Sequence, residues 1–138
     1  MTELEDKPLG YLLTRVATAL RSEVVATVLK AEELTFPEYL CLRMLSEWPA
    51  TPNAALARTA GISAQAMNKV VRELQDRDLV TRPATVSSGR SRPATLTRAG
   101  VATLTRMDPE VLAAERRVLG ALDESDQREF RRLLAALG

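Results

Sequence analysis

The sequence predicts a mainly α-helical fold: a winged helix-turn-helix with a small β-hairpin wing and a helical dimerisation region formed by the N- and C-terminal helices. Apolar residues make up 46% of the 138 residues but aromatic residues only 4%, which favours helices over a β-sandwich. Apolar positions recur at three- and four-residue steps along most of the chain. Residues 79–96 depart from this pattern and are rich in β-branched residues, which predicts a hairpin.

The first element is a long amphipathic helix, expected from about Pro8 to Glu32. Its apolar residues recur at helical spacing and are Leu12, Leu13, Val16, Leu20, Val24, Val28 and Leu29. A lone helix cannot hide this much apolar surface. Residues 1–34 are therefore interpreted as an N-terminal dimerisation helix.

The second helix has a strong start signal at Thr35. Glu38 stands three residues later, as a capping box requires, and Pro37 suits the first turn. Such a cap stabilises a helix by about 1 kcal/mol. Trp48 followed by Pro49 marks the expected end of this helix.

Two further helices joined by a glycine turn meet the needs of a helix-turn-helix. The first is expected over about residues 51–59, where Thr51 and Pro52 open it, and the second over about residues 63–77, with Ser63 as its cap. The motif needs a small residue at the helix crossing, a turn residue that accepts positive φ, and apolar residues that hold the pair together. The sequence supplies these in order as Ala57, Gly61, Met67 and Val70.

A short antiparallel hairpin should follow, with strands in residues 79–86 and 92–96. Pro83 and Pro93 each lack a ladder donor, which keeps the ribbon short. Residues 35–100 then form the winged helix-turn-helix lobe.

The C-terminal third, residues 101–138, is interpreted as further dimerisation helices within one structural domain overall. Thr97 begins a helix that Asp108-Pro109-Glu110 either kinks or ends and recaps. Asp123 caps a last helix.

Composition restricts the chemistry. The chain has no histidine and one cysteine, Cys41, so it can assemble neither a Cys/His zinc cluster nor an intramolecular disulfide. No glycine-rich phosphate loop is present, and no converging acid, base and nucleophile can be placed, which disfavours a small hydrolase. We therefore expect no enzyme, no metal and no cofactor. An acidic N-terminus and the lack of a long apolar run favour a cytoplasmic protein.

The positive charge is concentrated in the middle of the chain. Residues 51–100 carry a net charge of +5, whereas residues 1–50 carry −3 and residues 101–138 carry −1. A basic lobe in a nearly neutral protein suits a polyanionic partner, and a helix-turn-helix makes double-stranded DNA the expected one.

The helix after the glycine turn carries the expected DNA-binding face, formed by Ser63, Ala64, Gln65, Asn68, Lys69 and Arg72. Gln65 and Asn68 lie in its first turns, where either amide can pair with adenine in the major groove. Ser63, Lys69 and Arg72 suit phosphate contact. The alternative is a solvated helix face.

The expected wing carries three more arginines. Arg90 stands beside a glycine at the hairpin tip and is expected to enter the minor groove, with Arg82 and Arg92 on the DNA backbone. Exposed arginines on turns are common, so ordinary surface residues are the alternative here.

From Leu9 to Leu137 the chain resembles the MarR family of bacterial regulators. The segments that carry the resemblance are Leu34-Thr35, Leu56-Ala57, Gly61-Ile62-Ser63, Leu74, Leu79-Val80-Thr81-Arg82 and the Leu-Thr-x-x-Gly signature Leu96-Thr97-Arg98-Ala99-Gly100. The resemblance implies a homodimer with interlocked terminal helices, in which two winged motifs read the halves of a pseudo-palindromic operator about 34 to 36 Å apart. The family pattern differs at two places: Ser88 stands where an acid often orients the wing arginine, and Asp78 stands where glycine usually ends the recognition helix.

The resemblance also implies a repressor released by a small aromatic or amphipathic effector. The effector pocket would lie near Tyr11, Arg15, Tyr39, Met44 and Trp48. Each of these residues equally suits the core or the dimer interface.

Cys41 suits a structural thiol better than an oxidant sensor, because few cations lie near it in the sequence. The alternative function is a winged-helix protein-interaction module that binds no operator.

Overall fold

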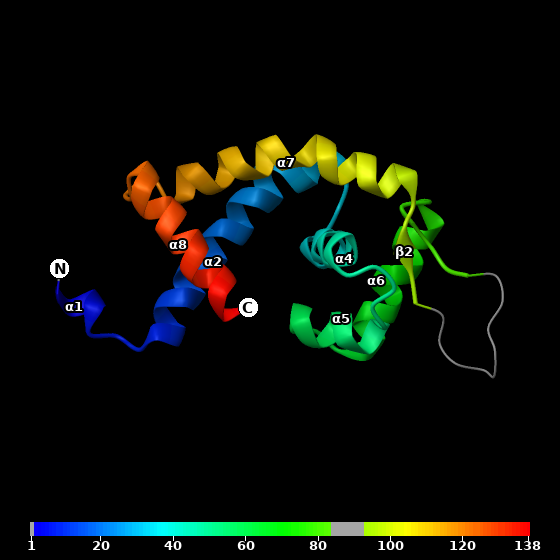
Figure 1. Cartoon of the computed structure of the whole chain (residues 1–138), viewed down its shortest axis with the longest axis horizontal. Helices are drawn as coiled ribbons and strands as arrows, with labels where there is room; N and C mark the ends of the chain where they lie inside the picture. The colour runs from blue at the N-terminus through cyan, green and yellow to red at the C-terminus, as the bar shows by residue number, and fades with distance from the viewer. Residues whose placement is uncertain (1, 84–92) are drawn as a thin grey trace.

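The computed structural model describes residues 2–83 and 93–138, whose regular secondary structure is helical apart from one two-stranded antiparallel sheet. The N- and C-terminal helices lie at one end and the winged lobe at the other, and α7 runs between the two ends (Figure 1). The elements are α1 (Thr2–Glu5), α2 (Leu9–Val24), the π-helix η1 (Val25–Leu29), α3 (Lys30–Glu32), α4 (Phe36–Glu47), α5 (Asn53–Ala60), α6 (Ala64–Asp76), β1 (Val80–Thr81), β2 (Thr95–Leu96), α7 (Arg98–Val118) and α8 (Glu124–Leu137).

The long N-terminal helix is present, but it contains a π-helical turn that the sequence analysis did not anticipate. Residues 25–29 form η1, between α2 and α3. The helix ends where Glu33 takes a left-handed conformation, with φ of 56°, and the amide of Leu34 donates to the carbonyl of Leu29 at 3.0 Å. This reversal of the chain leads directly into the cap of α4.

The predicted capping box of α4 is confirmed. The Glu38 amide donates to the Thr35 hydroxyl at 3.2 Å, and the Thr35 amide donates to the Glu38 carboxylate at 2.8 Å. Cys41, Leu42 and Leu45 on α4 are buried in the centre of the core. Helix α4 thus holds the winged lobe against η1 and α7.

Helices α5 and α6 form the predicted helix-turn-helix. Gly61 has φ of 71°, the left-handed conformation that the turn needs, and the Ile62 amide donates to the Ala57 carbonyl at 3.1 Å. The expected start of α5 was wrong in detail. Pro52 occupies the cap position, and the Thr51 hydroxyl donates to the Trp48 carbonyl at 2.6 Å instead.

The strands pair Val80 with Leu96 and Thr81 with Thr95. Thr97 then caps α7, its hydroxyl accepting from the Gly100 amide at 3.0 Å. A Cβ at position 100 would lie 2.2 Å from the Leu79 carbonyl oxygen, so only glycine allows α7 to approach the segment between α6 and β1 this closely. The middle of the predicted hairpin, residues 84–92, lies outside the described residues.

Pro109 neither ends nor recaps α7. The helix continues through it from Arg98 to Val118, so one of the two possibilities left open by the sequence, a stop at this point, is excluded. After Val118, Asp123 caps α8 as predicted, accepting from the Asp126 amide at 2.8 Å.

The terminal helices leave much apolar surface uncovered in the single chain. None of the residues of α8 is buried, and within α2 only Val24 is. Exposed apolar side chains at this end include Leu4, Leu9, Tyr11, Leu13, Leu133, Leu134 and Leu137. A patch of this kind is typical of a protein interface and agrees with the expected homodimer. No helix in the described part of the chain is long and apolar enough to span a membrane.

Candidate nucleic-acid interface

Helix α6 presents the predicted face to solvent. Gln65, Asn68, Lys69 and Arg72 are all exposed, and they lie opposite the buried stripe of Met67, Val70, Val71 and Leu74. The buried stripe packs against α4 and α5. The same packing that forms the core therefore turns these four polar side chains outward.

The N-terminus of α6 is capped and exposed. The Ser63 hydroxyl oxygen accepts from the Ala66 amide at 3.0 Å, which leaves its O–H group free to donate. Ser63 and Ala64 are both exposed. The positive end of the helix dipole at this position favours a phosphate.

A groove of about 450 Å³ lies beside this face. Its lining comes from α5, α6 and the chain after β1, and consists of Pro52, Asn53, Ala54, Ala64, Asn68, Arg72 and Arg82. Arg82 is half-buried, and its Nε atom has no hydrogen-bond partner among the described residues. A groove with two guanidinium groups and an unsatisfied donor suits an anionic group such as a phosphate.

Asn53 is a member of this site that sequence reasoning missed. Its amide nitrogen donates to the Asn68 side-chain oxygen at 3.0 Å. An amide oxygen has two lone pairs, so the Asn68 oxygen can accept one further hydrogen bond beside the one from Asn53. The only local signal was the place of Asn53 at the start of α5, which does not by itself indicate a contact with α6.

Lys69 is only weakly engaged within the protein. Its ammonium lies 3.9 Å from the Glu73 carboxylate one turn further along α6, and its side chain is 72% exposed. Exposed ion pairs of this type contribute little, so Lys69 remains available for a phosphate.

The structure leaves the predicted wing arginines largely undescribed. Of the three, Arg82 is placed in the groove, whereas Arg90 and Arg92 lie outside the described residues, together with Ser88. Asp78, at the family's glycine position, has φ of 64° and therefore takes the left-handed conformation expected there.

The described residues place Arg15 and Tyr39, two of the five residues expected around a ligand pocket, at different grooves of the single chain. Arg15 stacks over Tyr11 on α2, with its guanidinium carbon 5.8 Å from the ring centre. The Tyr39 hydroxyl accepts from Arg43 at 3.2 Å on the side of α4 that faces α7, and Met44 packs on the core. Trp48 ends α4 and is 67% exposed.

Another groove lies between α2 and the start of α4. It encloses about 870 Å³ and is lined by residues that include Arg21, Val25, Lys30, Leu34 and Phe36. The Arg21 guanidinium carbon lies 5.1 Å from the centre of the Phe36 ring. Sequence reasoning missed this groove, because the spacing of Arg21 and Phe36 gives no sign that they meet.

Cys41 is fully buried. Burial raises the pKa of its thiol to about 12, an effect that the positive charge of Arg82 only partly offsets. The thiol therefore stays protonated near neutral pH, as a structural residue should.

A model of the MarR family matches residues 34–92. The HTH-type transcriptional repressor Rv2887 of Mycobacterium tuberculosis is 54% identical over 134 residues, which cover 97% of this chain and 96% of that protein.

Two solved structures of the M. tuberculosis MarR family protein Rv2887 have the same fold. The complex with salicylic acid superposes with a TM-score of 0.83 at 53% identity, over 98% of this chain and 99% of that one. The complex with DNA gives a TM-score of 0.77 at 49% identity, over 96% of this chain and 99% of that one.

Proposed function

The chain belongs to the MarR family, and on this basis we propose that it is a transcriptional repressor that binds a pseudo-palindromic operator as a homodimer and is released by a small aromatic acid. The observation that carries the proposal is the exposed N-terminal face of α6. It combines a capped helix end, two amide side chains and two cations in the basic third of the chain.

In this proposal the N-terminal turns of α6 enter the major groove. Gln65 and Asn68 contact base edges, and Asn53 holds the Asn68 side chain in place through the 3.0 Å hydrogen bond. Ser63 with Ala64, Lys69 and Arg72 contact the flanking phosphates, and Arg82 closes the groove from the side of the wing. Arg90 and Arg92 remain proposed minor-groove and backbone contacts.

The two recognition helices of a dimer would occupy successive major grooves. Residues 1–34 and 101–138 supply the dimerisation helices, and residues 35–100 supply the lobe that reads each half-site. A dimer doubles every phosphate contact, so the binding constant should fall steeply with salt concentration.

The experiment begins by selecting bound sequences from random duplex DNA with the wild-type protein. The dissociation constant for the selected operator is then measured at several salt concentrations, for wild type and for Lys69→Glu/Arg72→Glu. We expect this charge reversal to weaken binding by at least about 100-fold, because four phosphate contacts per dimer become repulsive. The control is Arg132→Glu on α8, which reverses one exposed positive charge far from α6.

The alternative, a protein-interaction module, makes the opposite prediction. Wild-type protein would then shift no duplex at low salt, and its complex with a protein partner would survive the charge reversal. A dissociation constant that barely changes with salt would contradict the phosphate assignments.

The groove between α2 and α4 is the proposed effector site. Arg21 and Lys30 supply positive charge for a carboxylate, while Val25 and Phe36 offer apolar contact for a ring. The related protein Rv2887 forms a complex with salicylic acid, which makes salicylate a suitable probe. We expect salicylate to weaken operator binding by the wild type and to have much less effect on Arg21→Ala. If Arg15→Ala abolishes the response and Arg21→Ala does not, the effector instead binds beside Tyr11 and Arg15.

A further inference from the structure

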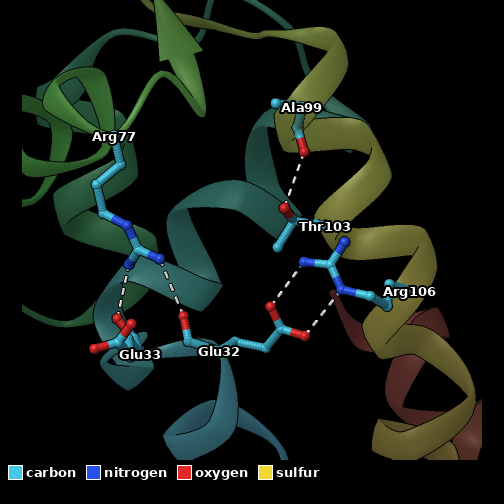
Figure 2. Close-up of polar contacts among 6 residues, drawn as sticks. All are labelled: Glu32, Glu33, Arg77, Ala99, Thr103 and Arg106. Carbon is cyan, nitrogen blue, oxygen red and sulfur yellow. Dashed lines mark hydrogen bonds and ion pairs between the residues drawn. The ribbon is translucent and has the colours of Figure 1, made fainter.

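Three segments that are distant in the sequence meet at the C-terminal end of α3. Figure 2 shows Arg77 from the end of α6 reaching the backbone of Glu32 and Glu33, and Arg106 from α7 reaching the Glu32 carboxylate. The Arg77 guanidinium donates to the carbonyl oxygens of Glu33 at 2.7 Å and of Glu32 at 3.0 Å. Arg106 donates to both carboxylate oxygens of Glu32, from Nε at 3.1 Å and from Nη2 at 2.8 Å.

The acceptors for Arg77 exist because a helix ends there. The last carbonyl groups of a helix have no partner within it and carry the negative end of its dipole, which attracts a cation. The left-handed conformation of Glu33 turns the chain away and leaves these two carbonyls open to a single guanidinium. One planar fork can therefore bind both.

Glu32 is held on its other side by Arg106. The hydrogen bonds from Arg106 lower the pKa of the Glu32 carboxyl against the opposing effect of burial, and the charges of Arg106 and Arg77 lower it further. The Glu32 side chain is 19% exposed. The carboxylate is thus ionised at neutral pH and fixed to α7, and the backbone next to it is fixed to Arg77.

The hydrogen bonds of Arg77 join the winged lobe to the N-terminal helix, whereas the apolar contacts of α6 are made within the lobe. The buried face of α6 packs on α4 and α5. Arg77 instead joins the end of α6 to the N-terminal helix and, through Glu32, to α7. One residue further on, the Asp78 carbonyl accepts from the Thr97 hydroxyl at 2.6 Å, which ties the same turn to the start of α7.

We propose that Arg77 is a positioning residue for operator binding. With Glu32, Glu33 and Arg106 it fixes the recognition helix α6 to the dimerisation helices, and so sets the distance between the two recognition helices of the dimer. This rests on the proposed function of α6. A direct role in DNA contact suits Arg77 poorly. It lies about 20 Å along α6 from Ser63, at the rise of 1.5 Å per residue, and between Asp76 and Asp78.

The test uses operator spacing as its readout. Dissociation constants are measured for the operator selected by the wild type and for the same half-sites moved one or two base pairs closer or further apart. The variants are Arg77→Ala, Arg77→Lys, which keeps the charge but loses the fork, and the control Arg132→Ala. Arg132 also binds a carboxylate with two nitrogens, but its partner Glu129 is on its own helix α8.

We expect Arg77→Ala to bind the native operator about ten-fold more weakly, a change of about 1.4 kcal/mol. It should also discriminate less between native and altered spacings, with an unchanged slope of affinity against salt. Arg77→Lys should fall between it and the wild type, and Arg132→Ala should match the wild type. Thermal unfolding in parallel identifies any variant that fails to fold. If Arg77→Ala fails to fold, Arg106→Ala provides the same spacing readout, because Arg106 holds the Glu32 side chain from α7.

Three results would overturn the role of Arg77. If Arg77→Ala binds the operator as tightly as the wild type does, Arg77 has no role in operator binding. An equal loss on all spacings, with a salt slope lower by about two per dimer, would make Arg77 a phosphate contact. An equal loss on all spacings with an unchanged slope would make it only structural. Wild-type protein that binds no duplex at all would overturn the proposed function itself.

Discussion

At the residue scale, the thiol of Cys41 has a strongly raised pKa and takes no part in the proposed site. Cys41 is fully buried, at the centre of α4. Desolvation favours its neutral form, which is why its pKa is raised to about 12. A cysteine in this position is a packing residue.

We predict that Cys41 reacts slowly with iodoacetamide in the native protein up to at least pH 9, and rapidly in urea. In the unfolded chain the thiol has an ordinary pKa of about 8.5, so it carries fewer protons above that pH than the folded state does. The free energy of unfolding therefore falls as the pH rises from about 8.5 towards 12. Mass spectrometry of the alkylated protein checks the rate; fast native labelling at neutral pH would contradict the assignment and favour a redox role.

The expected cap residues show how well local signals predict local structure. Thr35, Ser63, Thr97 and Asp123 each accept the capping hydrogen bond at the start of a helix. These bonds join residues three apart, so the sequence contains all the information needed. Bonds such as Asn53 to Asn68 or Arg77 to Glu33 depend on tertiary packing, and no local pattern could predict them.

At the scale of elements, periodicity predicted the polar face of α6 because its apolar residues already identify the opposite face. The π-helical turn of η1 was not predicted, since Val25–Leu29 has the composition of an ordinary helix. The continuation of α7 through Pro109 could not be decided locally either. Its other contacts, with α2, η1 and α4, outweigh the one hydrogen bond that a proline removes.

The junction between β1 and α7 gives a prediction about Gly100. Gly100→Ala should destabilise the protein by about 2 kcal/mol, because the new Cβ would meet the Leu79 carbonyl oxygen at 2.2 Å and the backbone must move. The free energy of unfolding in urea measures the effect. The matched control is Gly10→Ala on α2, where nothing lies within 4 Å; helix propensity makes it neutral or stabilising by less than about 1 kcal/mol. Equal effects at the two sites would contradict the close approach.

At the scale of the whole molecule, the winged lobe and the terminal helices differ in how much of their apolar surface is buried. The core is concentrated in the winged lobe and the helices next to it, whereas α8 has no buried residue and ends with Leu137 at 81% exposure. A monomer would leave this surface in water. This surface therefore suits the interface of a homodimer.

We predict that Leu134→Glu/Leu137→Glu weakens the dimer by at least about 100-fold, because each copy loses the burial of two leucines, worth about 1.5 to 3 kcal/mol apiece. Sedimentation over a range of concentrations measures this. Arg132→Glu, on the opposite face of α8, should leave the dimer intact. If both variants stay dimeric, the interface lies elsewhere.

The unbroken course of α7 has a mechanical consequence. With 21 residues it is a rod about 31 Å long, so a tilt of roughly 5° at the dimer end displaces the lobe by roughly 3 Å. Such a rod amplifies a small shift of subunits into a loss of register with the DNA helix. It is most compliant at Pro109, where one internal hydrogen bond is missing, and the neighbouring Asp108 is clamped to Arg43 of α4. The ion pair thus joins α7 to α4 next to the position where α7 lacks a hydrogen bond.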